Sequence, residues 1–266
     1  MKKITVIGGD NRLKILKERL TQMGYAVDTL GLYDNDFADI TTSQVLILPV
    51  PSTKDGVNVF TPLTKRIIPL KSIASATTKE QLILCCNYCF ENKNSVDYGS
   101  LDSYALLNSV PTAEGAIKLA IENTPYTIWK SRALVIGYGR VGKILSDRLK
   151  SLGCEVTVSA RKPADWALLD ALGFEYINTG HLNLKPLDYD MIFNTVDVKV
   201  IDDEALKNCR CDLMIDLSTY GGFSLESANN CGIKAIKAGG LPALIAPKTA
   251  AEILSNTVIH IINTYN

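Results

Sequence analysis

The sequence lacks an excess of charge of either sign. It contains 28 Lys and Arg residues against 28 Asp and Glu residues, so its formal net charge is zero. A broad nucleic-acid or anionic-membrane surface needs a basic excess, so neither partner is expected. No apolar run approaches the roughly 20 residues that span a bilayer. The first residues enter a predicted strand without a secretory signal, which favours a cytoplasmic protein.

Several catalytic motifs are also missing. There are only two histidines, and no His-Glu-x-x-His, Gly-x-Ser-x-Gly or Walker A lysine occurs, so metalloprotease, esterase and P-loop functions have no support. Seven cysteines, an odd number, fit a reducing compartment better than a disulfide framework. The pairs Cys86/Cys89 and Cys209/Cys211 lack a convincing four-ligand set. We therefore interpret them as buried or incidental thiols and expect no metal.

Two segments, residues 4–30 and 133–159, resemble each other and align without a gap. Each reads as a β-branched strand, a glycine turn, an amphipathic helix and a second strand, which is one βαβ unit. The chain is therefore predicted to be an α/β protein with two doubly wound, Rossmann-like domains and parallel sheets.

The second copy carries a complete Gly-x-Gly-x-x-Gly motif between its strand and its helix. In this context the first glycine allows the tight turn, the second admits a pyrophosphate, and the third lets helix and strand pack closely. The helix N-terminus then offers N–H groups to the phosphates. The predicted cofactor-binding turn consists of Gly137, Tyr138, Gly139, Arg140, Val141 and Gly142.

The first copy has lost this motif, because Asp10 and Leu13 occupy the second and third glycine positions. A carboxylate would repel a pyrophosphate, and a leucine would keep the helix off the strand. The N-terminal domain is therefore predicted to bind something else, which we take to be the substrate.

The second strand of the dinucleotide unit ends without the acid that usually holds the ribose of NAD. It runs instead into Ser159, Arg161 and Lys162, which suit a 2′-phosphate because a hydroxyl and a guanidinium can donate to it. We therefore expect NADP; the alternative is that the two cations form a solvated loop. Asn194 and Thr195, which follow a later strand, are further predicted cofactor contacts.

The remaining elements outline two domains and a returning helix. They are expected at residues 45–48, 81–85, 104–122, 163–172, 190–194, 212–216, 233–236 and 248–263. The last helix has an apolar stripe and is expected to pack back on the N-terminal domain. The predicted N-terminal, flavodoxin- or Rossmann-like substrate domain comprises residues 1–107 and about 248–266, and the NADP domain comprises 108–247.

Four stretches carry a family resemblance: Val6–Arg12, Asn108–Gly115, Gly137–Gly142 and Gly240–Ala250. Over essentially its whole length the chain resembles the dipicolinate synthase A-subunit family of endospore-forming bacteria. The resemblance implies NADP-dependent oxidation of a dihydro- or hydroxytetrahydro-dipicolinate from the lysine pathway to dipicolinic acid. It further implies action in the mother cell during sporulation and a flavoprotein-like partner, the dipicolinate synthase B subunit. It leaves a homo-oligomer open.

A dicarboxylate substrate needs hydrogen-bond donors. Ser109 and Thr112 at the start of one predicted helix, and Lys248 and Thr249 at the start of the last, fit that need. Plain helix-start chemistry is the alternative for both segments, because each has a proline suited to a first turn.

Four further residues are candidates. Glu114 is the carboxylate best placed to accept the proton, with a helix-capping role as the alternative. Arg12 would pair with a substrate carboxylate or be solvated, and Ser52 follows a predicted strand. The family pattern has an arginine in the loop after residue 216; this chain lacks it, so Ser218 or Thr219 takes its place or the arginine is not essential.

Two alternatives stay open. One is a D-2-hydroxyacid-dehydrogenase-like oxidoreductase, a class that uses an Arg/Glu/His set, although neither His181 nor His260 is suitably placed. The other is a non-catalytic NADP-binding regulatory or scaffold subunit.

Overall fold

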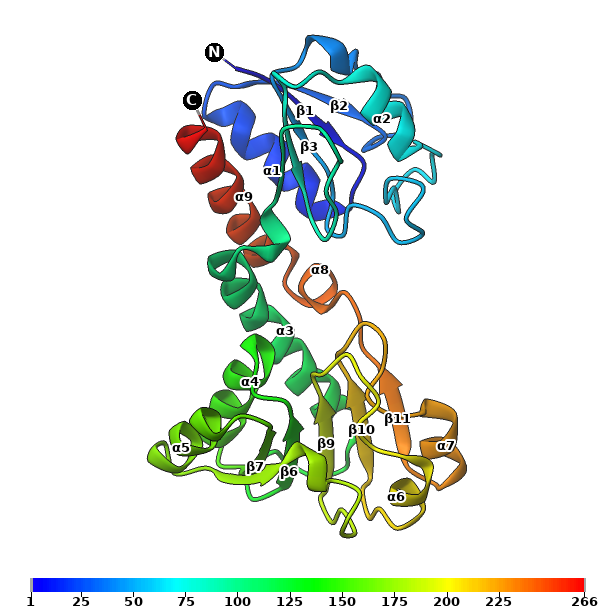
Figure 1. Ribbon diagram of the computed structural model, residues 1–266, viewed down its shortest axis with the longest axis vertical. Coiled ribbons are helices and arrows are strands. Elements are labelled where there is room, and N and C mark those ends of the chain that lie inside the picture. Colours follow the sequence, from blue (N-terminus) through cyan, green and yellow to red (C-terminus); the bar gives the residue numbers. More distant parts are fainter. Residues whose placement is uncertain (1, 266) are drawn as a thin grey trace. The chain divides into compact units, whose positions relative to one another are not determined.

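The computed structural model describes residues 2–265 and divides them into two compact units (Figure 1). Unit 1 contains residues 2–108 and 242–265, and unit 2 contains residues 109–241. Both are parallel sheets with alternating helices, which confirms the predicted fold class. Within residues 2–265 no helix is long and apolar enough to cross a membrane.

Unit 1 has five parallel strands in the order β2-β1-β3-β4-β5. Successive residues of β3 point to opposite faces: Val45 and Ile47 join the core that contains α1, and Leu46 joins the core that contains α2. Both faces are thus buried, as is usual for a parallel sheet. The elements are β1 (Lys3–Ile7), α1 (Asn11–Gln22), β2 (Ala26–Leu30), a 3₁₀ turn (Ile40–Thr42), β3 (Val45–Ile47), α2 (Leu70–Ala76), β4 (Leu82–Cys85), β5 (Ser95–Asp97) and a 3₁₀ turn (Tyr98–Ser100).

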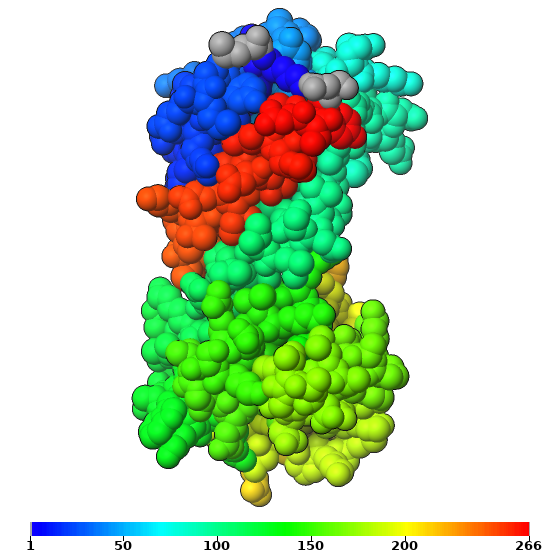
Figure 2. Space-filling view, turned by 90° about the vertical axis from the view of Figure 1, so that its left-hand side faces the viewer, coloured from blue at the N-terminus to red at the C-terminus, as the bar shows by residue number. Residues whose placement is uncertain are grey.

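The C-terminal helix α9 (Pro247–Thr264) belongs to unit 1, where it packs beside α1 (Figure 2). Leu254 and Val258 are fully buried there and share a core with Leu16 and Leu20 of α1. The apolar stripe of the last helix is therefore part of the N-terminal core, and the predicted return of this helix is confirmed.

Unit 2 has six parallel strands in the order β11-β10-β9-β6-β7-β8. The direction of winding reverses between β6 and β9, which is the place where open α/β sheets bind their ligands. Its elements are β6 (Arg132–Ile136), α4 (Arg140–Ser151), β7 (Glu155–Ala160), α5 (Pro163–Ala171), β8 (Glu175–Asn178), a 3₁₀ turn (Thr179–His181), β9 (Met191–Asn194), α6 (Asp203–Lys207), β10 (Leu213–Asp216), α7 (Leu225–Asn230) and β11 (Lys234–Lys237).

Two helices contain the points at which the chain passes between units: α3 (Asp102–Asn123) and α8 (Leu241–Ile245). α3 confirms the helix expected at residues 104–122. The placing of Ser109 and Thr112 at a helix start is wrong, because Pro111 lies inside this helix of 22 residues. A proline suits a first turn, but a helix interior can also hold one at the cost of one backbone hydrogen bond.

Candidate functional site

The glycine turn of unit 2 has the backbone that its motif predicts. Gly137 has φ +97°, and a Cβ there would lie 2.6 Å from Thr195 Oγ1. A Cβ at Gly142 would lie 2.0 Å from the carbonyl oxygen of Gly137. A side chain at Gly142 would collide with the turn itself, and one at Gly137 would collide with the residues that follow β9. The close approach of these segments therefore requires both glycines.

Gly139, between them, has open space instead. It is the N-cap of α4, no side chain caps the helix there, and a Cβ would meet no atom within 4 Å. The first amides of α4 border this space, and a helix N-terminus attracts anions. The turn can therefore accommodate a pyrophosphate beside the helix N-terminus.

β9 ends at Asn194, Thr195 follows it, and both side chains form hydrogen bonds within unit 2. Thr195 donates from Oγ1 and from its amide to the carbonyl of Ile136, at 2.8 and 2.9 Å. The buried Asn194 donates from Nδ2 to Asp216 Oδ1 at 2.8 Å and to the carbonyl of Val196 at 2.9 Å. Both predicted cofactor residues thus lie at the switch point, but their side-chain donors already have partners within unit 2.

Asp216, at the end of β10, was not among the predicted site residues. Its side chain is 1% exposed and accepts hydrogen bonds from Asn194, from Ser218 Oγ at 2.7 Å and from Lys237 Nζ at 2.9 Å. Burial raises the pKa of Asp216, but the hydrogen bonds from Ser218, Asn194 and Lys237 outweigh burial and hold it below its usual value. The carboxyl edge of the sheet therefore contains a fixed anion.

The hydroxyl groups at strand ends are mostly occupied within the protein. Ser159 is fully buried and its Oγ lies 3.1 Å from Thr179 Oγ1. Ser218 donates to Asp216 and accepts from the amide of Gly221 at 3.0 Å. In unit 1, Ser52 is fully buried and accepts from the amide of Cys86 at 2.8 Å. The hydroxyl groups of these three serines therefore stabilise the packing of loops and strands through internal hydrogen bonds.

Unit 1 holds a rigid guanidinium at the carboxyl end of β1. Asp10 caps α1, and its carboxylate accepts from Arg12 Nε at 3.0 Å and from Nη2 at 2.7 Å. Nη2 also donates to the carbonyl of Val50 at 2.7 Å, and the Arg12 side chain is only 6% exposed. The alternative that Arg12 is simply solvated is therefore wrong. Burial lowers the pKa of Arg12, but the hydrogen bond and charge of Asp10 outweigh it and raise that pKa.

Comparison with known proteins places the chain in a family. Residues 3–99 match the model of the N-terminal domain of the dipicolinate synthase A subunit. The dipicolinate synthase A subunit of Bacillus subtilis (strain 168) is 32% identical over 279 residues, which cover 96% of this chain and 94% of the relative. The chain belongs to the dipicolinate synthase A-subunit family.

Solved structures agree with this assignment. The dipicolinate synthase A subunit from Bacillus halodurans has a TM-score of 0.88 at 28% identity, covering 98% of this chain and 97% of that one. The corresponding protein from Bacillus subtilis also has a TM-score of 0.88, at 30% identity, with coverage of 98% and 96%. The D-lactate dehydrogenase of Salmonella, at 14% identity, has a TM-score of 0.65 with coverage of 97% and 95%, and so shares the fold.

The predicted catalytic residues of this family member, and the predicted substrate residues Ser109 and Thr112, lie on helices. Glu114 is exposed on α3 and forms an ion pair with Arg148 of α4, with Oε1 3.4 Å from Nη2. The capping interpretation of Glu114 is wrong, because the helix begins at Asp102. Ser109 and Thr112 lie within the same helix, so they are not at a helix N-terminus.

Lys248 and Thr249 do lie in a first turn. They follow Pro247 at the start of α9, and both side chains are exposed. The predicted start of this helix is confirmed, and its first amides together with the ammonium of Lys248 can attract an anion.

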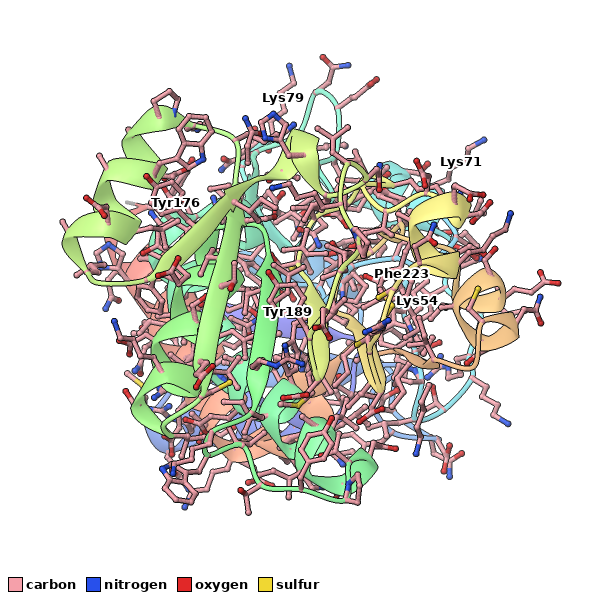
Figure 3. The ribbon with its side chains drawn as sticks, turned by 90° about the horizontal axis from the view of Figure 1, so that it is seen from below. Lys54, Lys71, Lys79, Tyr176, Tyr189 and Phe223 are labelled. Carbon is pink, nitrogen blue, oxygen red and sulfur yellow. The ribbon has the colours of Figure 1, made fainter. Side chains whose placement is uncertain are left out.

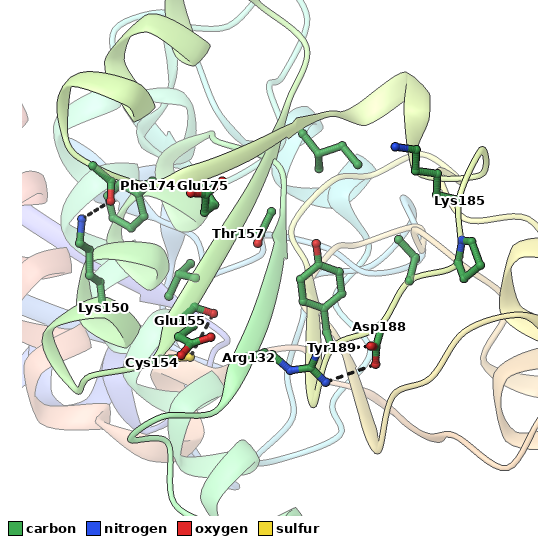
Figure 4. A pocket seen from close by; sticks show the side chains of 15 residues that line it. Arg132, Lys150, Cys154, Glu155, Thr157, Phe174, Glu175, Lys185, Asp188 and Tyr189 are labelled. Atoms are coloured by element: carbon green, nitrogen blue, oxygen red, sulfur yellow. Dashed lines mark hydrogen bonds and ion pairs between the residues drawn. The ribbon is translucent and has the colours of Figure 1, made fainter.

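A further groove of unit 2 lies away from the predicted site residues. A groove of about 660 Å³ opens at the amino ends of β6, β7 and β8, and Arg132, Thr157 and Tyr189 contribute to its walls (Figure 4). Tyr189 is seen in front of the strands when the molecule is viewed from below (Figure 3). No predicted site residue lines this groove, and it is at the end of the strands opposite to the glycine turn.

Proposed function

We propose that the protein is an NADP-dependent dehydrogenase that oxidises a dihydrodipicolinate-type intermediate of the lysine pathway to dipicolinic acid. The observation that carries the proposal is the glycine turn at Gly137–Gly142, open at its second glycine, in a member of the dipicolinate synthase A-subunit family. When bound, the dinucleotide would supply the hydride acceptor.

Unit 2 is the proposed NADP domain. The amides of the glycine turn would bind the pyrophosphate, and the exposed side chains of Arg161 and Lys162 would bind the 2′-phosphate. The buried hydroxyl of Ser159 would support the same loop through Thr179. Among residues 2–265 the side chains of these two cations form no ion pair, so both charges are available to the phosphate.

Unit 1 is the proposed substrate domain. Asp10 excludes a pyrophosphate from the first glycine turn and holds Arg12, which would bind a carboxylate of the substrate through Nη1. Among the described residues Nη1 has no hydrogen-bond partner. Lys248 and Thr249 would supply further donors. Because aromatisation drives the reaction, positioning of the substrate matters more than a strong base, and Glu114, paired with Arg148, is not needed for it.

The proposal also includes a partner subunit and a cellular location. Relatives are named as one subunit of dipicolinate synthase, so we expect a second one, the flavoprotein-like B subunit, and action in the mother cell of a sporulating bacterium. The alternative is a regulatory subunit that binds NADP without turnover.

The test is redox turnover by the purified protein. It is incubated with NADP⁺ and a dihydrodipicolinate source, with and without the B subunit, and NADPH and dipicolinate are followed together. We expect both to rise in equal amounts. With 2-oxo acids and NADPH we expect no oxidation of NADPH, since such oxidation would indicate a D-2-hydroxyacid dehydrogenase. Binding of NADP⁺ without turnover in every mixture would instead support a regulatory role.

Gly139→Asp is the variant designed to abolish dinucleotide binding without unfolding the chain. It places in the second copy the residue that the first copy has at the same position, and the open space around Gly139 leaves room for the side chain. We expect an unchanged thermal unfolding curve and loss of dinucleotide binding, because the new carboxylate faces the pyrophosphate. Retained binding by a folded Gly139→Asp protein would remove the turn from the site.

A further inference from the structure

Three polar residues lie side by side at the carboxyl ends of β9, β10 and β11. Asp216 is in register with Asn194 on one side and with Lys237 on the other. Oδ1 of Asp216 accepts from Asn194 Nδ2 at 2.8 Å, and Oδ2 accepts from Lys237 Nζ at 2.9 Å. The carboxylate is buried, whereas 36% of the Lys237 side chain is exposed. The row ends in a cation at the surface.

Stability alone does not explain this ion pair. Burying a carboxylate is costly, and replacing a buried ion pair by apolar residues of similar volume is often neutral or stabilising. Asp216 also fixes the loop that follows β10, through the amide and hydroxyl of Ser218 at 3.1 and 2.7 Å. The pair is therefore held rigidly at one edge of the sheet.

The ion pair of Asp216 and Lys237 lies on the side of the switch point where the nicotinamide half of a dinucleotide is expected. The glycine turn follows β6, and the predicted 2′-phosphate residues follow β7 on one side of it. In doubly wound folds the dinucleotide lies across the switch point, so its nicotinamide half extends to the other side, toward β9 and β10. Asn194 and Asp216 end those two strands.

The two redox forms of the nicotinamide differ in charge, because the oxidised ring is a cation and the reduced ring is neutral. A fixed anion beside the ring favours the oxidised form, and a fixed cation opposes it. We propose that the ion pair of Asp216 and Lys237 sets the relative affinity of unit 2 for oxidised and reduced dinucleotide. This proposal rests on the proposed function. Asp216 and Lys237 would act through their charges on the bound nicotinamide, without taking part in the reaction.

Two single variants of the full chain test it by opposite effects. Lys237→Met leaves the anion uncompensated, and Asp216→Asn leaves the cation. We measure the dissociation constants of NADP⁺ and NADPH by titration calorimetry. We expect the ratio of the NADP⁺ constant to the NADPH constant to fall about fivefold in Lys237→Met and to rise by a similar factor in Asp216→Asn, because the uncompensated charge interacts with the charged oxidised ring and not with the neutral reduced one.

Three further proteins exclude a merely structural effect. The double variant Asp216→Asn/Lys237→Met and the conservative Lys237→Arg should both return the ratio to that of the unaltered chain. Lys234→Met, which removes an exposed charge at the opposite end of β11, should leave it unchanged. Circular dichroism verifies folding, and if Asp216→Asn does not fold, the contrast of Lys237→Met with Lys237→Arg decides.

The outcomes separate the two proposals. Ratios that stay constant, or that move in the same direction in both single variants, overturn the role of the ion pair while NADP binding stands. If the unaltered chain binds neither form of the dinucleotide, the proposed function fails and the role of the pair fails with it.

Discussion

Arg161 and Lys162 are the residues at which the choice between NADP and NAD is best tested. Both are exposed just after β7, and the end of that strand carries no acid of the kind that binds a ribose hydroxyl. We expect Arg161→Ala to weaken NADP⁺ binding about tenfold, as for the loss of a charge-assisted hydrogen bond, and to leave NAD⁺ binding unchanged. Lys185→Ala, an exposed change in the distant groove, is the control. Equal losses for both nucleotides would contradict a 2′-phosphate role.

Asp36 allows a prediction of pH dependence outside the proposed sites. Its carboxylate accepts from the amides of Gly31, Leu32 and Tyr33 at 2.6, 2.9 and 3.0 Å and lies 2.9 Å from Arg66 Nη1. Burial raises the pKa of Asp36, but these hydrogen bonds outweigh it and lower that pKa.

A carboxyl group with a lowered pKa stabilises the fold at neutral pH and loses this contribution as pH falls through its folded value. We therefore expect Asp36→Asn to lower the free energy of unfolding at neutral pH, with the difference from the unaltered chain shrinking below about pH 4. Urea unfolding at a series of pH values measures it. A difference that stays constant with pH would mean that the charge of Asp36 is not what matters.

At the residue scale, the sequence predicted which residues stand at strand ends but not what their side chains touch. Ser52 and Ser218 follow strands as expected, whereas Ser159, expected just after a strand, lies inside β7. The hydroxyl of each is hydrogen-bonded within its own unit. The hydrogen bond of Lys237 to Asp216 joins residues from different βα units. A pattern of residue types predicts where a strand ends along the chain. The hydrogen-bond partner of a side chain depends on tertiary packing, which that pattern does not specify.

At the scale of elements, α9 is the clearest case of a helix stabilised by distant contacts. Leu254 is fully buried among residues of α1 and the sheet of unit 1. We expect Leu254→Ala to lower the free energy of unfolding by about 2–5 kcal/mol, the usual range for a buried leucine. Glu252→Ala, at an exposed position of the same helix, should change it little. Equal effects in urea unfolding would show that α9 is not part of the core.

The helices differ in how well their limits could be predicted. Pro247 stands at the start of α9 as expected, whereas Pro111 lies within α3. Both prolines have the same local chemistry, and the difference lies in what surrounds them. Ala113, Ala116 and Ala120 are fully buried along α3, so packing of this small-residue face offsets the lost backbone hydrogen bond.

For the whole molecule, the repeated βαβ pattern was sufficient to predict two parallel sheets, because strand, glycine turn and helix recur at matching positions. The same comparison indicated which copy kept a dinucleotide turn, and the open space at Gly139 agrees with it. The order of strands within each sheet needed the structure, since parallel neighbours are joined by crossovers whose path no local pattern specifies.

The core of unit 1 is built from both the earliest and the latest parts of the chain that the structure describes, since α1 packs against α9. A ribosome makes α1 before unit 2 and α9 after it. Unit 2 is continuous from residue 109 to residue 241, so all of its strands have been synthesised before α9 exists. Domains generally fold as units during synthesis. Unit 2 is therefore expected to fold first, while α1 exposes its apolar face until α9 leaves the ribosome.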